Sequence, residues 1–205
     1  SKAIDHALAL EAEGADLIDI GGESTRPGAL AVSLDEEQRR VLPVIKALVK
    51  RIKIPLSIDT RKSEVARAAV EAGASVINDI SALHYDEKML SVAAKGQTGL
   101  VLMHSQGTPE MMQDNPKYRD VIEEIHHFMR ECLLQTDKVK IKRNRVAIDP
   151  GIGFGKTLSH NLAIINQLKK LTDLEVPVLL GPSRKSFIGE VLGGLPVKER
   201  LEGTA

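Results

Sequence analysis

Acidic and amide side chains stand at the ends of several short apolar runs, where they could hold a ligand. Asp59 ends the run Leu-Ser-Ile-Asp, Asn78 ends Val-Ile-Asn, and Asp149 follows Val-Ala-Ile. A carboxylate can accept two neighbouring N–H groups, and an Asn side chain can donate one bond and accept another. Together these groups could hold a flat, donor-rich heterocycle. The local alternatives are that Asp59 caps the helix that follows and that Asn78 fixes a turn.

A glycine-rich segment offers groups suited to an anion. It reads Asp-Ile-Gly-Gly-Glu-Ser-Thr-Arg-Pro-Gly over positions 19–28. Glycines let the backbone approach a ligand closely, Thr25 supplies a hydroxyl, and Arg26 supplies a two-pronged donor for carboxylate or phosphate. The alternative is a surface turn that happens to contain an arginine.

A second glycine-rich segment, Asp-Pro-Gly-Ile-Gly-Phe-Gly-Lys at 149–156, resembles a nucleotide phosphate loop but lacks its spacing. A Walker A motif would need glycine at position 150, where Pro150 stands. ATP hydrolysis is therefore disfavoured. We expect these glycines to shape a wall of the site, with Phe154 offering an apolar face.

The segment Gly-Pro-Ser-Arg-Lys-Ser-Phe at 181–187 links a strand pattern to a helix pattern. Ser183 is placed to cap the helix, whose first N–H groups attract anions. Arg184 and Lys185 would then lie in the first turn, where the helix dipole disfavours cations. Cations in an unfavourable position at a strand end suggest a functional site. The alternative is a capped surface helix with solvated basic residues.

These residues must be positioned by alternating strands and helices. Apolar runs of strand length occur at Ala15–Ile20, Ile54–Ile58, Ser75–Ile80, Gly99–Met103, Val146–Ile148 and Val176–Leu180. Helical patterns occur at Lys2–Glu13, Glu36–Arg51, Ser63–Ala72, Asp86–Ala94, Lys117–Leu134, Ser159–Leu171 and Ser186–Leu192, with glycine stops expected at Gly73 and Gly96. Repeated strand–helix units predict a parallel sheet.

The position of the polar residues favours a barrel over a doubly wound sheet. No G-x-G-x-x-G follows the first strand, and polar residues gather at the carboxyl ends of several strands, as in a (β/α)8 barrel. The residues at or near those ends are Asp19, Asp59, Asn78, Asp79, His104, Asp149 and Ser183. The sequence thus predicts one domain over 1–205, a TIM (β/α)8 barrel truncated to about six parallel strands and incomplete at both ends. His104 could line the pocket or lie in the core.

Composition limits the partners. The 28 basic and 28 acidic residues cancel, which gives no general attraction to nucleic acid or to anionic lipid. Aromatic residues make up 2% of the chain, too few to favour single-strand nucleic-acid binding. We expect no nucleic-acid or membrane partner, a cytoplasmic protein, and a buried, inert thiol at Cys132.

Five of these motifs together resemble the dihydropteroate synthase family, from Lys2 to the last residue. They are Asp-Ile-Gly-Gly-Glu-Ser-Thr-Arg-Pro-Gly-Ala, Ile-Asn-Asp-Ile, Leu-Met-His-Ser-Gln-Gly, Asp-Pro-Gly-Ile-Gly-Phe-Gly-Lys and Ser-Arg-Lys-Ser-Phe-Ile-Gly. The resemblance implies condensation of 6-hydroxymethyl-7,8-dihydropterin diphosphate with para-aminobenzoate, giving 7,8-dihydropteroate and diphosphate in folate biosynthesis. It also implies a sulfonamide target and a dissociative route without an enzymic nucleophile.

The resemblance implies roles residue by residue. Lys185 and Asp59 would be the catalytic groups. The pterin diphosphate would be bound by Thr25, Asp59, Asn78, Met103, Asp149 and Lys185, and para-aminobenzoate by Arg26, Phe154 and Ser183. It further implies a homodimer of the full-length protein.

Two parts of the family pattern are absent from the 205 residues. One is the opening strand and loop, with an Asn that helps to hold Mg²⁺; the other is a closing Arg-x-His motif that binds diphosphate. We therefore expect Mg²⁺ as a cofactor with its ligand in the missing N-terminal segment, no metal ligand in this chain, and weak binding and turnover by the chain alone. The alternatives are a pterin-binding methyltetrahydrofolate–corrinoid methyltransferase and a non-catalytic pterin-binding barrel.

Overall fold

Five parallel strands form the centre of the chain. The computed structural model describes residues 1–26, 28–107, 112 and 115–205. Within them the strands are β1 (Ile18–Gly21), β2 (Leu56–Asp59), β3 (Val76–Asp79), β4 (Gly99–Met103) and β5 (Val146–Asp149), and their order in the sheet is the order of the sequence. Each strand contains Ile, Val or Leu, and a residue of this kind is buried in every one of them.

The register aligns the carboxyl ends of the strands at one edge of the sheet. Gly21 lies opposite Asp59, which lies opposite Asn78, and Met103 lies opposite Asp149. This alignment confirms that polar residues from separate strands reach a common edge, although Asp19 is the second residue of β1 rather than its last.

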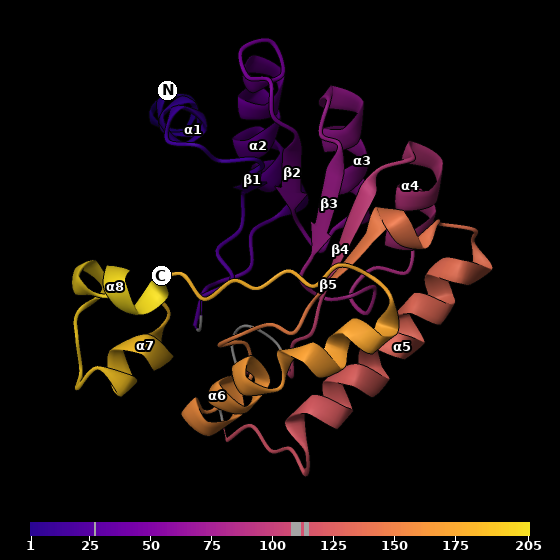
Figure 1. The fold of residues 1–205 in the computed structure, drawn as a ribbon. Coiled ribbons are helices and arrows are strands. Elements are labelled where there is room, and N and C mark those ends of the chain that lie inside the picture. The colour runs from indigo at the N-terminus through magenta and orange to yellow at the C-terminus, as the bar shows by residue number, and fades with distance from the viewer. Residues whose placement is uncertain (27, 108–111, 113–114) are drawn as a thin grey trace.

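Helices follow the strands and cover the sheet (Figure 1). They are α1 (Lys2–Ala12), α2 (Leu34–Leu48), α3 (Ser63–Ala72), α4 (Met89–Gly96), α5 (Val121–Lys138), α6 (Leu158–Asn166), α7 (Ser186–Val191) and α8 (Leu201–Thr204), with 3-10 turns at Arg143–Arg145, Leu168–Leu174 and Val197–Glu199. Side-chain caps explain three of the starting points. Ser33 accepts from Glu36 N, Asp120 accepts from two N–H groups of α5, and Thr157 forms a capping box with His160.

The core lies between the sheet and these helices. Ile58, Ile77 and Ile148 are fully buried in neighbouring strands, and Ile45 and Met129 are buried on helices that pack on them. Cys132 is also buried, and burial raises the pKa of its thiol to about 12. The expected burial of Cys132 is thus confirmed, and the raised pKa disfavours the thiolate, which is the reactive form.

Three local predictions need correction. The run Val176–Leu180 forms only an isolated bridge, at Val178 opposite Ile148, because Pro177 has no N–H to donate to a ladder. Gly96 lies inside α4, and Gln97 takes the left-handed conformation that ends the helix, whereas Gly73 ends α3 as predicted. The helix predicted over Ser159–Leu171 is divided between α6 and the 3-10 turn that follows it.

The described helices include none that is both long enough and apolar enough to cross a membrane.

Candidate active site

Asp59 is the buried centre of the strand-end edge. Its Oδ1 is buried and accepts no hydrogen bond from any residue that the structure describes. Opposite it, Gly21 leaves the carboxylate room: a Cβ on Gly21 would lie 3.5 Å from Asp59 Oδ2. Burial, followed by the negative charges of Asp19 and Glu37, raises the pKa of Asp59 to about 8. These surroundings therefore favour a neutral carboxyl group at neutral pH.

The structure excludes the two local roles considered above, a helix cap for Asp59 and a turn residue for Asn78. Asn78 Nδ2 donates to Asp19 Oδ2 at 3.1 Å, so its side chain reaches across β2 rather than fixing a turn. Asp59 does not cap α3, since the residue at the N-cap is Lys62. Both side chains are thus available to a ligand at the sheet edge.

Asp149 and Lys185 form the opposite side of this edge. Asp149 Oδ1 accepts from Gly151 N at 2.7 Å, and burial raises the pKa of Asp149 despite that bond and the positive charge of Lys185. Lys185 Nζ donates to Ile152 O and stands 4.6 Å from the centre of the Phe154 ring. Lys185 therefore points toward the strand ends. Burial lowers its pKa, although the charge of Asp149 opposes this effect.

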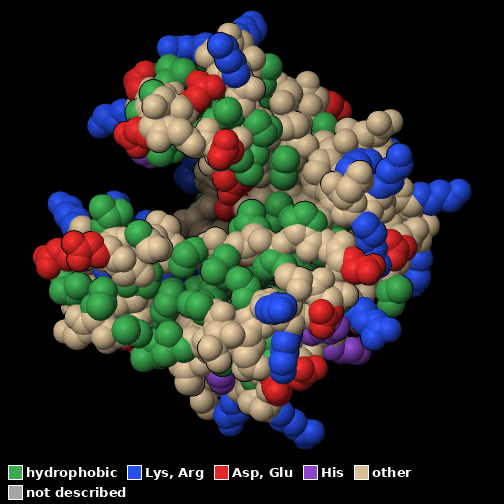
Figure 2. Space-filling model, in the orientation of Figure 1, with side chains coloured by type: hydrophobic (Ala, Val, Ile, Leu, Met, Phe, Trp, Pro, Cys, Tyr) green, Lys and Arg blue, Asp and Glu red, His purple; other side chains and the backbone are tan. Residues whose placement is uncertain are grey.

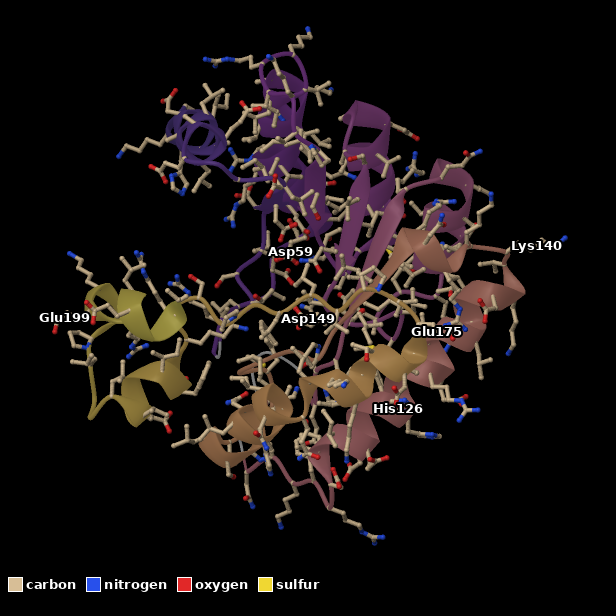
Figure 3. All side chains as sticks on the ribbon, in the orientation of Figure 1. Asp59, His126, Lys140, Asp149, Glu175 and Glu199 are labelled. Atoms are coloured by element: carbon tan, nitrogen blue, oxygen red, sulfur yellow. The ribbon has the colours of Figure 1, made fainter. Side chains whose placement is uncertain are left out.

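Asp59 and Asp149 both lie where the strands end (Figure 3). Met103, the register partner of Asp149, is buried beside it. Figure 2 shows a deep hollow between the surface over α1 and that over α7 and α8, with acidic side chains at its inner end.

The remaining predicted residues lie on loops around this edge. Thr25 is half-buried and Arg26 is exposed, both on the loop after β1, while Ser183 is exposed on the segment before α7. The prediction that Ser183 caps α7 is wrong, because the helix begins at Ser186 with Lys185 at its N-cap.

Arg184 explains the late start of α7. Its φ of 52° is left-handed, and its backbone bonds to α8 and the turn before it: Arg184 N donates to Thr204 Oγ1 at 3.0 Å, and Arg184 O accepts from Arg200 at 3.1 Å. Arg184 and Lys185 therefore do not occupy the first helical turn, and the argument from the helix dipole no longer applies to them.

Sequence reasoning missed Lys156, a buried cation beneath the site. Its Nζ contacts three acceptors, namely His104 Nδ1 at 3.0 Å, Phe154 O at 2.9 Å and His104 O at 3.4 Å. Three acceptors match the three N–H bonds of an ammonium group, although burial lowers the pKa of Lys156 to about 7. Lys156 thus joins the loops after β4 and β5. The sequence feature that could have indicated a role for Lys156 is its position at the end of the second glycine-rich segment.

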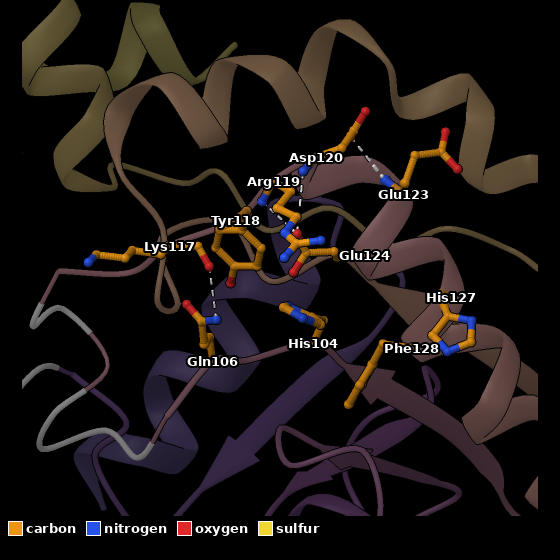
Figure 4. A pocket seen from close by; sticks show the side chains of 10 residues that line it. All are labelled: His104, Gln106, Lys117, Tyr118, Arg119, Asp120, Glu123, Glu124, His127 and Phe128. Atoms are coloured by element: carbon orange, nitrogen blue, oxygen red, sulfur yellow. Dashed lines mark hydrogen bonds between the residues drawn. The ribbon is translucent and has the colours of Figure 1, made fainter.

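His104 faces both Lys156 and a separate cavity. Burial, and next the charge of Lys156, lower the pKa of His104 to about 3, so its ring is neutral. On its other side lies a cavity of about 840 Å³ beside α5, whose lining includes Gln106, Tyr118 and Phe128 (Figure 4). The expectation of a buried His104 is thus confirmed, and the cavity that it lines is not the one predicted at the strand ends.

The described residues contain no group of three or more His, Cys, Asp and Glu side chains placed to hold a metal ion. These residues do not fit a Mg²⁺ site by themselves.

The comparisons with known proteins agree with this geometry. Residues 1–205 match the family described as pterin binding enzyme. The dihydropteroate synthase of Bacillus subtilis is 47% identical over 203 residues, which cover 99% of this chain and 68% of that protein. The chain belongs to the dihydropteroate synthase family.

Solved structures of the family share the fold. The Xanthomonas albilineans dihydropteroate synthase with 4-aminobenzoic acid is 47% identical and has a TM-score of 0.92, over 98% of this chain and 71% of that one. The same organism's enzyme in complex with 7,8-dihydropteroate is 42% identical with a TM-score of 0.88, at the same coverage of 98% and 71%. The predicted barrel-type α/β fold is confirmed.

The backbone approach at Gly151 gives a stability prediction. With φ +68°, a Cβ at Gly151 would lie 1.9 Å from His104 O, whereas at Gly193, with φ +74°, a Cβ would meet no described atom within 4 Å. Gly193→Ala should cost about 1 to 2 kcal/mol, from the left-handed backbone alone. Gly151→Ala should cost about 1 to 3 kcal/mol more, because the loops after β4 and β5 must separate. Urea unfolding measures both, and equal losses would contradict the close approach.

The raised pKa of Asp59 predicts an unusual pH dependence. Between the unfolded value of 3.8 and the folded value of about 8, the native protein keeps a proton that the unfolded chain has lost. The contribution of Asp59 to the free energy of unfolding should therefore fall as pH rises through this window, by at most about 1.4 kcal/mol per pH unit. Asp59→Asn should flatten that slope in urea unfolding from pH 5 to 8.

Asp137→Asn is the control for this series. The bond from Arg143 lowers the pKa of Asp137, so its contribution is lost only as pH falls. The slope between pH 5 and 8 should be the same in this variant as in the wild type. An unchanged slope in Asp59→Asn would contradict the assignment.

Proposed function

We propose that this chain condenses 6-hydroxymethyl-7,8-dihydropterin diphosphate with para-aminobenzoate through the residues at the strand-end edge. The observation that carries the proposal is the carboxylate of Asp59, buried at the strand ends with an oxygen that accepts no bond from a described residue. A buried acceptor of this kind calls for a donor, and a pterin edge presents an amino group beside a ring N–H.

In this proposal the pterin is held from two sides. Asp59 and Asn78 on neighbouring strands would bind one part of the ring edge, and Asp149 another. Lys185, which points to the strand ends, would donate to the ring oxygen and nitrogen, and buried Met103 would contact the ring. Donors on the ligand favour the ionised carboxylate, so binding should release the proton that Asp59 otherwise holds.

The second substrate would bind nearer to the surface. Arg26 is exposed and carries the fixed charge suited to the carboxylate of para-aminobenzoate, while Phe154 offers a ring face and Ser183 a hydroxyl. Thr25, one residue before Arg26, would face the diphosphate.

The chemistry needs positioning and charge more than a nucleophile. The bond between the pterin methylene and the diphosphate oxygen breaks, and its electron pair leaves with the diphosphate. The amine nitrogen of para-aminobenzoate then bonds to the methylene and loses a proton. Lys185 and Asp59 act by fixing the pterin and its charge while the bonds exchange.

Three further features belong to the proposal. Mg²⁺ would accompany the diphosphate. The full-length protein would form a homodimer, and the exposed Val191, Leu192, Val197 and Leu201 around α7 and α8 are apolar surface that a partner could cover. The protein would act in the cytoplasm.

Calorimetric titration of the full-length protein tests the pterin site. Para-aminobenzoate should bind only when diphosphate or a pterin product is present, and Asp149→Asn should weaken pterin binding by about 10- to 100-fold, the worth of a bond to a charged group. Asp173→Asn, at an exposed position, is the control and should leave the affinity unchanged. Equal pterin affinities in the two variants would refute the assignment of Asp149.

Arg26→Ala tests the second subsite. The KM for para-aminobenzoate should rise by about tenfold or more, while pterin affinity changes by less than about threefold, because only one substrate carries the carboxylate. Arg39→Ala removes another exposed arginine, paired to Glu36 on α2, and should change neither constant. A proportional loss of both constants in Arg26→Ala would count against the subsite.

A further inference from the structure

Glu23 closes the base of the loop that carries Thr25 and Arg26. Its side chain is 9% exposed. Oε2 accepts from the backbone N–H of Val32 at 2.8 Å, so one carboxylate joins the two ends of a loop nine residues apart in sequence.

The same carboxylate is anchored to the neighbouring strand. Lys62 Nζ donates to Glu23 Oε2 at 2.7 Å, and Arg61 Nε donates to Glu23 Oε1 at 3.0 Å. Both cations follow β2 directly. Burial alone would raise the pKa of Glu23, but the bonds from Lys62 and Val32 and the charge of Arg61 outweigh it and lower the pKa. Glu23 therefore stays ionised at neutral pH.

Lys62 extends this anchor into the core. It also binds Glu37, which is 1% exposed on α2, and Glu37 Oε1 accepts from Thr60 Oγ1 at 2.6 Å. The base of the loop is thus connected to α2 and to the end of β2 through buried charged groups. Such groups are held in place strongly, because breaking one pair leaves the other charge buried without a partner.

The outer part of the loop has weaker attachments. Arg26 N donates to Ser24 Oγ at 3.4 Å, and Ala29 N donates to Arg26 O at 3.0 Å, so both bonds stay within the loop. Arg26 itself is exposed, and Leu30 is 84% exposed. The position of Arg26 relative to the strand ends therefore depends on the base of the loop.

We propose that Glu23 is a positioning residue for the second substrate, acting through the loop that bears Arg26. This inference rests on the proposed function, in which Arg26 receives the carboxylate of para-aminobenzoate. Glu23 touches neither substrate. Its loss releases the loop end at Val32 and the link to Lys62, and Arg26 then samples positions away from the subsite.

Glu23→Gln is the test variant, since it keeps the size of the side chain and removes the charge. In the full-length protein the KM for para-aminobenzoate should rise by about tenfold, as small displacements of positioning groups cost at least this much. The KM for the pterin diphosphate should change by less than about threefold. Glu71→Gln is the matched control, because Glu71 also pairs with an arginine, Arg67, but at exposed positions of α3, and should change neither constant.

A second variant separates positioning from a general loss of structure. Lys62→Met removes one of the two cations that hold Glu23 and leaves its bonds to Arg61 and Val32, so it should raise the KM for para-aminobenzoate by less than Glu23→Gln does. Thermal unfolding of each variant reports any loss of folded protein. An equal rise of both substrate KM values in Glu23→Gln would overturn the proposal, since it would indicate a general structural effect.

A double-mutant cycle with Arg26→Ala tests the pathway of the effect. If Glu23 acts through Arg26, adding Glu23→Gln to Arg26→Ala should change the KM for para-aminobenzoate by less than about twofold. Multiplicative effects of the two substitutions would overturn the inference while leaving the proposed function intact. If Arg26→Ala alone leaves this KM unchanged, the assignment of the subsite fails instead.

Discussion

The placement of a carboxylate in a buried position, next to other negative charges, is the constraint on which this site depends. Parallel register brings Gly21, Asp59 and Asn78 to one level at the sheet edge. Removing Asp59 from water there is unfavourable for its charged form, and the acidic groups around it add to the effect. A ligand with hydrogen-bond donors reduces both the cost of burying the charge and the effect of the acidic neighbours. Ligand binding at this edge and ionisation of Asp59 are therefore linked, because the strands hold Asp59 in these surroundings.

The charges around the edge are divided between two sides. On the side of β1 to β3, Asp19, Glu23, Glu37 and Asp79 raise the pKa of Asp59, and Arg61 and Lys62 partly balance them. On the side of β5 and α7, buried Lys156 and half-buried Lys185 stand near Asp149. A chain with no net charge thus carries a strong local gradient across its strand ends. Such a gradient orients a polar ligand even before contacts are made.

Sequence patterns predicted the parts of this arrangement that depend on local chain properties. The five strands, the limits of α3 and the shared edge for Asp59, Asn78 and Asp149 followed from apolar runs and strand ends. The start of α7 did not, because the left-handed Arg184 is held by bonds to Thr204 and Arg200, which lie far along the chain. Lys156 and Glu23 were missed for the same reason. Their partners come from other loops, and periodicity contains no information on such contacts.

The closed loop between residues 23 and 32 also separates two requirements, stability of the fold and recognition of a ligand, that most binding sites must satisfy with the same residues. Its anchor is buried and charged, so few replacements there are compatible with folding. Between these points the described side chains are largely exposed, and the bonds from Arg26 N to Ser24 Oγ and from Ala29 N to Arg26 O stay within the loop. Substitutions in that span can therefore accumulate with little effect on stability. In the proposed function, changes in the exposed span would adjust which aromatic amines the subsite accepts, while the anchor and the sheet beneath it stay constant.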